Sequence, residues 1–239
     1  MNEFDGVLLI DKDGGCTSHD VVNKVRRILK IRSVGHAGTL DPLATGLLVI
    51  LVGKATKLSQ YLMSLDKVYT GEFVLGIETN SQDSEGEVVA QLPIPEGLDA
   101  ESLQKQMNSF LGDQYQTPPM FSAKKVNGIP LYKLARQGQE VAREPRFINI
   151  SRFALAKFES PKGAFELACT KGTYVRTVCH DLGKRIGCGA HMTALRRTVS
   201  GKFDVKNAIT VDQLQQMNSA AIKKQLISVA EASPTFVSL

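Results

Sequence analysis

The order of the predicted strands and helices is consistent with an α+β fold. Strand-like segments are numerous, and they alternate with amphipathic helical segments irregularly, without a repeating strand-helix-strand unit. At 239 residues the chain can bury a substantial core, as one large domain or as one domain with a small appendage. No internal repeat or low-complexity tract interrupts it.

The first third of the chain is predicted to hold three strands and two helices. Thr17 and Asp20 have the spacing of a capping box, which opens the first helix. The third strand alternates, so that Tyr69, Phe73 and Ile77 face inward together. The strands are expected over residues 6–10, 47–52 and 67–77, and the helices from residue 17 and over residues 54–65.

Turn signals organise the rest of the chain. Asn127-Gly128 between two apolar runs predicts a hairpin. Thr173 is expected to open a helix whose first turn holds Arg176. The helix dipole favours acids there, so we expect Arg176 to pair with a carboxylate elsewhere. The other elements expected are a returning strand over 87–91, helices over 100–111 and 131–138, strands over 146–159 and 164–170, and two helices after residue 210.

Charge is segregated along the chain, although the net charge is only +5. Residues 78–104 contain seven acids and no lysine or arginine, whereas basic residues collect at 24–32, 124–152 and 184–206. Such segregation favours a nucleic-acid partner, while the alternative is three ordinary solvated faces. The four cysteines form no CxxC pair, which indicates reduced thiols in a cytosolic protein and no zinc site. No signal peptide or membrane span is predicted.

A glycine-rich loop over residues 35–46 is the most distinctive stretch. Asp41 is its only carboxylate, and it follows a basic segment that runs from Lys24 to Arg32. An enzyme that acts on a polyanion could display a carboxylate in this way. The alternative is that Asp41 caps a short helix with Pro42 at its first position.

The loop, GHAGTLDPLATGLL, resembles the catalytic loop of the TruB family of tRNA pseudouridine synthases. Two further blocks resemble that family, PPMFSAKKVNGIPLYKLARQG and CTKGTYVRTVCHDLGKRIGCGAHMTALRRT. The opening matches the family's Lys-Pro-x-Gly-x-Thr-Ser at Lys12, Gly15, Thr17 and Ser18, but Asp13 replaces the proline. The resemblance covers residues 5–210.

The resemblance implies the pseudouridine synthase fold, with a mixed, mostly antiparallel sheet flanked by helices and a central active-site cleft. It implies isomerisation of uridine to pseudouridine at position 55 in the T loop of tRNA, without a metal or redox cofactor. We expect a cytoplasmic monomer that binds tRNA and needs no protein partner or membrane. Residues 1–210 would be the catalytic domain and 211–239 a short helical extension, with the family's PUA-type domain absent.

The family's motifs also imply roles for single residues. Asp41 would be the nucleophile, Arg176 would form a salt bridge with it, and Tyr69 would stack on the target base and could transfer a proton. Tyr174 and Leu195 would wall the base pocket, and His36 would fill space left by flipped bases. Phosphate contacts are expected among Lys12, Lys24, Arg26, Arg27, Lys124, Lys125, Arg196 and Arg197.

Three other functions stay open from the sequence. A non-catalytic tRNA-binding protein or tRNA-folding chaperone would use Asp41 only as a cap. A glycoside hydrolase would need a second carboxylate, which the loop lacks. A relative that works on guide RNA within a larger complex is disfavoured because basic tails and extra domains are missing.

The role of Tyr69 also has an alternative, since a tyrosine on the inward face of a strand could be an ordinary core residue.

Overall fold

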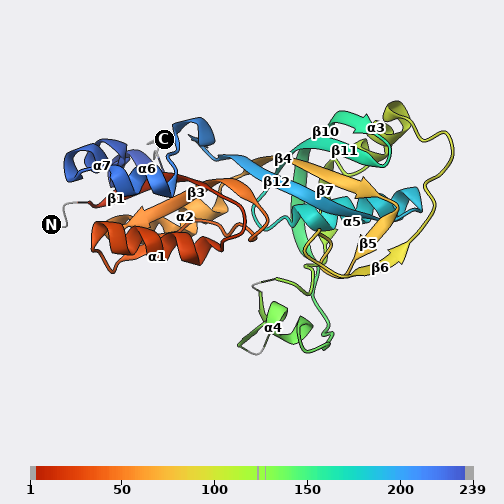
Figure 1. Cartoon of the computed structure of the whole chain (residues 1–239), viewed down its shortest axis with the longest axis horizontal. Coiled ribbons are helices and arrows are strands. Elements are labelled where there is room, and N and C mark those ends of the chain that lie inside the picture. Colours follow the sequence, from red (N-terminus) through yellow and green to blue (C-terminus); the bar gives the residue numbers. More distant parts are fainter. Residues whose placement is uncertain (1–3, 123, 127, 235–239) are drawn as a thin grey trace, which may run out of the picture. The chain divides into compact units, whose positions relative to one another are not determined.

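The computed structural model describes residues 4–122, 124–126 and 128–234, and the chain forms two compact units. The first unit combines Met1–Tyr69 with Leu195–Leu239, and the second is Thr70–Ala194. Strands β4 (Lys67–Leu75) and β12 (Ala190–Ser200) contribute residues to both units. In Figure 1 the first unit is therefore coloured red, orange and blue, and the second yellow to cyan.

The first unit is built on strands β1 and β3. They pair antiparallel from Gly6↔Val52 to Lys12↔Gly46, and β12 lies parallel to β3 through Arg196↔Thr45. The elements of this unit are β1 (Gly6–Lys12), α1 (Ser18–Leu29), β2 (Val34–His36), β3 (Thr45–Val52), η1 (Gly53–Leu58), α2 (Ser59–Ser64), β13 (Phe203–Asp204), η2 (Val205–Asn207), α6 (Val211–Gln216), α7 (Ser219–Gln225) and α8 (Val229–Ala232).

Strand β3 is buried along almost its whole length, which explains its unbroken apolar sequence. Leu47, Val49 and Leu51 join one hydrophobic cluster with Val7, and the residues between them are equally buried. A strand covered on both faces reads as a continuous apolar run instead of an alternating one. This buried strand begins at Thr45, within the last two residues of the glycine-rich stretch, and fixes where the irregular part of that stretch ends.

The segment that follows β12 returns to cover the free edge of β1. Backbone hydrogen bonds join Val7 to Ile227 in both directions, at 2.8 and 2.9 Å. The amide of Asp11 donates to the carbonyl of Ile209 at 2.9 Å. The pairing covers an edge that would otherwise be open. The predicted domain boundary at residue 210 falls inside this unit.

The second unit places strands β4, β11, β10 and β7 side by side, in that order. Its core is a chain of rings: Phe73 contacts Phe165 at 6.1 Å, Phe165 contacts Phe153 at 5.6 Å, and Phe153 contacts Phe110 at 6.0 Å between centroids. The other elements are β5 (Ile77–Thr79), β6 (Val88–Gln91), α3 (Ala100–Asn108), β7 (Gly112–Gln116), β8 (Lys125–Val126), β9 (Ile129–Pro130), α4 (Leu131–Ala135), β10 (Arg146–Glu159), β11 (Lys162–Cys169) and α5 (Val175–Ile186).

The sheet is mixed and mostly antiparallel, as the resemblance implied, with the parallel pair between β3 and β12. Several details differ from the sequence prediction, which did not include the strands β7 and β12. The strand expected over 67–77 breaks at Gly76, which adopts a φ of 87°. Tyr174, not Thr173, is the N-cap of α5. Three short helices, not two, follow residue 210 within the described part of the chain.

The predicted hairpin at Asn127-Gly128 is present as β8 and β9, which pair through Val126↔Ile129. Asn127 itself lies outside the described residues, and Gly128 has a φ of 82°. Among the helices that the structure describes, none has both the length and the apolar character needed to cross a membrane.

Candidate active site

The loop that carries Asp41 contains no helix. Residues 41–44 form a turn closed by the amide of Ala44, which donates to the carbonyl of Asp41 at 3.0 Å, and β3 begins at Thr45. The interpretation of Asp41 as a helix cap is therefore wrong, because Pro42 opens no helix for it to cap. The side chain of Asp41 is half-buried.

A buried arginine holds the middle of this loop. Arg197 is 1% exposed, and its guanidinium donates to the carbonyls of Gly38 at 3.0 Å, Thr39 at 3.4 Å and Leu47 at 2.8 Å. All three nitrogens of the guanidinium thus bind backbone on either side of Asp41. The expected phosphate contact of Arg197 is wrong, since a side chain this buried cannot reach a phosphate at the surface.

Two more side chains hold the residues on either side of Asp41. The hydroxyl of Ser18 accepts from the amide of Leu40 at 2.8 Å and donates to its carbonyl at 3.1 Å. The ammonium of Lys12 is 1% exposed and donates to the carbonyl of Pro42 at 3.3 Å. Asp41 therefore lies between Leu40, which is bound by Ser18 of α1, and Pro42, which is bound by Lys12 of β1. Lys12 is as buried as Arg197, so burial argues equally against a phosphate contact from its ammonium, and any other role toward RNA stays a prediction.

Glycine is required where the loop passes closest to β12. Gly46 has a φ of 95°, and a Cβ atom there would lie 2.3 Å from the carbonyl oxygen of Arg197. Side chains rarely adopt this backbone conformation, and the oxygen could not move without breaking the strand pairing. The loop's three glycines, Gly35, Gly38 and Gly46, are thus not equivalent. A Cβ at Gly35 would meet nothing within 4 Å.

His36 lies at the end of β2, next to the loop, and is half-buried. Its Nδ1 is buried and has no hydrogen-bond partner within the described residues. Burial lowers the pKa of His36 below its ordinary value of 6.5, and the charges of Arg197 and His19 lower it further. The imidazole is therefore neutral at neutral pH.

Tyr69 and Leu195 also belong to the first unit, and both are 8% exposed. Arg196 forms a bidentate ion pair with Asp11, at 2.9 and 2.6 Å, in a partly exposed position. The ion pair raises the pKa of Arg196. Its predicted phosphate contact stays a prediction, although the guanidinium already has an anionic partner.

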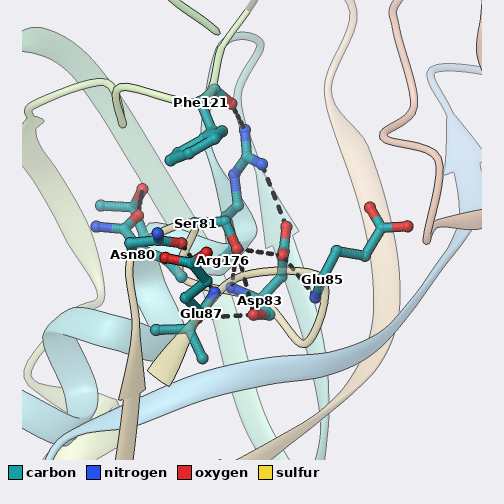
Figure 2. Close-up of polar contacts among 10 residues, drawn as sticks. Asn80, Ser81, Asp83, Glu85, Glu87, Phe121 and Arg176 are labelled. Carbon is teal, nitrogen blue, oxygen red and sulfur yellow. Dashed lines mark hydrogen bonds and ion pairs between the residues drawn. The ribbon is translucent and has the colours of Figure 1, made fainter. Parts of the chain in front are cut away.

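Arg176 lies in the second unit, in the first turn of α5, and is 5% exposed. One guanidinium nitrogen lies 3.3 Å from a carboxylate oxygen of Asp83, and the other terminal nitrogen donates to the carbonyl of Phe121 (Figure 2). The sequence prediction that Arg176 pairs with a distant carboxylate is thus confirmed. Its ring neighbour is Tyr174, whose centroid lies 5.8 Å from the guanidinium carbon.

Asp83, the partner of Arg176, is absent from the site residues expected from the sequence. It is 2% exposed and accepts from the hydroxyl of Ser81 at 2.5 Å and from the amide of Glu85 at 3.1 Å. The acidic segment around it is expected from the sequence only as the turn before the returning strand over 87–91. The sequence does contain an indication of this turn. Ser81 and Asp83 are short polar residues of the kind whose side chains bind nearby backbone in turns.

Tyr174 is fixed through its backbone instead of its ring. The side chain of Gln116 accepts from the amide of Tyr174 at 2.8 Å and donates to its carbonyl at 3.1 Å. This reciprocal pair ties the start of α5 to the edge strand β7. Lys124 is half-buried, and its carbonyl accepts from Leu131 at 2.8 Å.

The predicted site residues therefore form two groups. The first unit holds Asp41, Tyr69 and the other loop neighbours, and the second unit holds Arg176, Tyr174 and Lys124. The predicted salt bridge between Asp41 and Arg176 would join the two units and stays a prediction. In the described ranges no group of three or more His, Cys, Asp or Glu side chains is arranged to hold a metal ion.

Two family models match the chain. The model described as TruB family pseudouridylate synthase (N terminal domain) matches residues 26–175, and that of the tRNA pseudouridylate synthase B C-terminal domain matches residues 176–230. A tRNA pseudouridine synthase B from Opitutus terrae is 57% identical over 98% of this chain and 97% of that protein. The protein of the same name from Syntrophotalea carbinolica is 51% identical over 99% of this chain and 77% of its own length.

Solved structures show the same fold. The crystal structure of a Cbf5-Nop10-Gar1 complex contains a chain that superposes with a TM-score of 0.73 at 29% identity, over 97% of this chain. This chain spans 62% of the length of that one. A structure of an H/ACA RNP bound to a substrate RNA gives a TM-score of 0.68 at 26% identity.

Replacing Arg197 should destabilise the protein far more than replacing the arginine before it. Arg197→Met removes three hydrogen bonds from a buried charged side chain to backbone carbonyls, at about 1.5–3 kcal/mol each for a bond to a charged group, so we expect a loss of at least about 3 kcal/mol. Arg196→Met removes a partly exposed ion pair worth about 0–1 kcal/mol. Urea unfolding measures both, and equal losses would contradict the role of Arg197.

The neutral His36 should make stability depend on pH. Its folded pKa lies below 6.5, so the unfolded chain binds a proton first, and stability falls as the pH is lowered below that value. His36→Gln should therefore lose less unfolding free energy between about pH 7.5 and about pH 5.5 than the natural protein. His180, whose pKa burial also lowers, stays in both proteins, so the dependence shrinks without vanishing. An unchanged dependence would show that His36 does not carry it.

Proposed function

This chain belongs to the TruB family of pseudouridylate synthases, and we propose that it converts the uridine at position 55 in the T loop of tRNA to pseudouridine. The family models and the relatives named tRNA pseudouridine synthase B support isomerisation of uridine in tRNA. The position within tRNA is supported by the resemblance of three sequence blocks to that family. We place the reaction in the cytoplasm, where reduced cysteines are expected.

The reaction moves one bond within a nucleotide. The bond from N1 of the base to C1′ of the ribose breaks, the base turns, and C5 bonds to C1′. The proton leaves C5 and N1 gains one, so atoms and electrons balance without an oxidant. The chemistry needs a fixed anionic group beside the sugar and base, and a pocket for a base that has left its stack.

The observation that carries the proposal is the way Asp41 is held. Its neighbours Leu40 and Pro42 bind Ser18 and Lys12, and Arg197 binds the loop on both sides. A turn built only for the fold would not need a half-buried carboxylate at its centre. A nucleophile benefits from such fixation because the entropy of orienting it is lost before the substrate binds.

We propose that Arg176 and Asp83 complete the site. Arg176 would favour the ionised form of Asp41 by Coulomb attraction. Asp83 would act as a positioning residue, since it holds one terminal nitrogen of the guanidinium while the carbonyl of Phe121 holds the other. A flat guanidinium held at two points keeps one orientation.

We also propose that the aromatic and apolar residues receive the flipped base. Flipping costs a few kcal/mol, and stacking on an aromatic ring offsets about 1–3 kcal/mol of it. Tyr69 would supply that ring, with Tyr174 and Leu195 as walls. His36, whose buried Nδ1 can accept a hydrogen bond when neutral, would contact the RNA beside the base.

Tritium release tests the reaction and the nucleophile together. A T-loop transcript labelled at C5 of uridine should release tritium with the natural protein, because C5 loses its hydrogen when it bonds to C1′. Asp41→Ala should release none and still bind the transcript. The released label should map to one uridine. Tight binding by both proteins with no release from either would instead indicate a tRNA-binding protein without this activity.

Replacing Asp83 tests the support of Arg176. Asp83→Asn keeps the shape but removes the charge-assisted hydrogen bond, which is worth about 1.5–3 kcal/mol. We expect kcat to fall about tenfold or more, while KM changes little because Asp83 would not touch the RNA. Asp113→Asn is the matched control, an exposed aspartate that binds Asn149 at 2.7 Å in the same unit. Equal kcat values in both variants would contradict the positioning role.

A further inference from the structure

The first unit contains a groove whose rim includes Lys24 and Arg27, two of the cations expected from the sequence to contact phosphates. It has a volume of about 900 Å³ and lies between the C-terminal half of α1 and helices α6 and α7. Phe4 and Ile222 are among its apolar lining residues. Its rim carries Lys24, Arg27 and Lys30, all exposed, against one acid, Asp212.

The three cations of the groove are available to an anion. None of them forms an ion pair within the ranges that the structure describes, and the one hydrogen bond of Arg27 goes from Nε to the carbonyl of Asn23 at 3.3 Å. They are spaced three residues apart, so they form a band along one side of the helix. An apolar wall behind such a band strengthens its field, because low-dielectric surroundings screen charge less than water does.

Helix α1 links this groove to the Asp41 loop. The hydroxyl of Ser18, the first residue of α1, binds Leu40 beside Asp41. Lys30 is the C-cap at the other end of the helix. Because α1 has 12 residues, it spans about 18 Å at roughly 1.5 Å per residue. The cations of the groove begin at Lys24, six residues after Ser18, so they lie between about 9 and 18 Å along the helix from the residue that binds the loop.

We propose that the groove binds phosphates of the RNA substrate in the stem next to the loop that carries the target uridine. The inference rests on the proposed function for the identity of the polyanion. It adds a contact with the stem that extends from the loop being modified. RNA phosphates suit the site because its described lining has three cations against one acid.

RNA length separates this role from the chemistry. The triple variant Lys24→Gln, Arg27→Gln and Lys30→Gln is compared with the natural protein on a labelled hairpin with a stem of about three base pairs and on one with about ten. For the long hairpin we expect Kd to rise at least about tenfold, and the slope of log Kd against log salt to fall by about two to three. For the short hairpin, Kd and kcat should stay unchanged.

Two further variants sharpen the result. Lys54→Gln, Lys206→Gln and Lys224→Gln together remove the same charge from exposed positions of the same unit outside the groove. This control should change binding of the long hairpin about twofold or less. Asp212→Asn, which removes the acid from the lining, should tighten binding of the long hairpin alone.

Each result decides the proposal. Equal losses on both hairpins, no loss on the long one, or an equal loss in the control triple would overturn it, since the effect would then be structural or a matter of net charge. Thermal unfolding checks that the triple variant is folded. If the natural protein releases no tritium from either RNA, the proposed function fails, but the length dependence of binding still reports on the groove.

Discussion

The guanidinium of Arg197 is the interaction on which the arrangement of the first unit depends. A buried cation without water must find acceptors, and here all of them are backbone carbonyls, two before Asp41 and one after it. The same residue pairs with Gly46 in the parallel contact between β12 and β3. One side chain thus joins the sheet to the loop, so the position of Asp41 follows from the packing of the core instead of from the loop's own sequence.

Much of the fold was accessible from the sequence because its signals are local. The capping box of Thr17 and Asp20, the buried run of β3 and the long strands β10 and β11 all depend on neighbours within a few residues. The resemblance of the blocks supplied the topology, which local patterns do not contain. The end of a strand is hard to predict where it depends on one backbone angle. At Gly76 a positive φ ends β4, although the residues on both sides favour a strand.

The candidate site was predictable in its residue types and less so in its partners. Asp41 and Arg176 stand out in their motifs, but Asp83 is 93 residues from Arg176, and Arg197 is 159 residues from Gly38. Contacts at such separations depend on register and burial, which a single sequence does not encode visibly. Arg197 is an example. Its position in a basic stretch suggests a phosphate contact, and only the structure shows that the side chain is buried and binds backbone carbonyls.

The placement of β12 also sets an order for folding during synthesis. The strand belongs beside β3, yet about 140 residues of chain are made between them, at about 5–20 residues per second. Until β12 leaves the ribosome, β3 lacks a neighbour and the Asp41 loop lacks its buried cation. The second unit, which is continuous in sequence, can form first. A nascent chain would therefore hold Asp41 in a fixed position only after β12 has been made, so shorter nascent chains would lack the ordered loop.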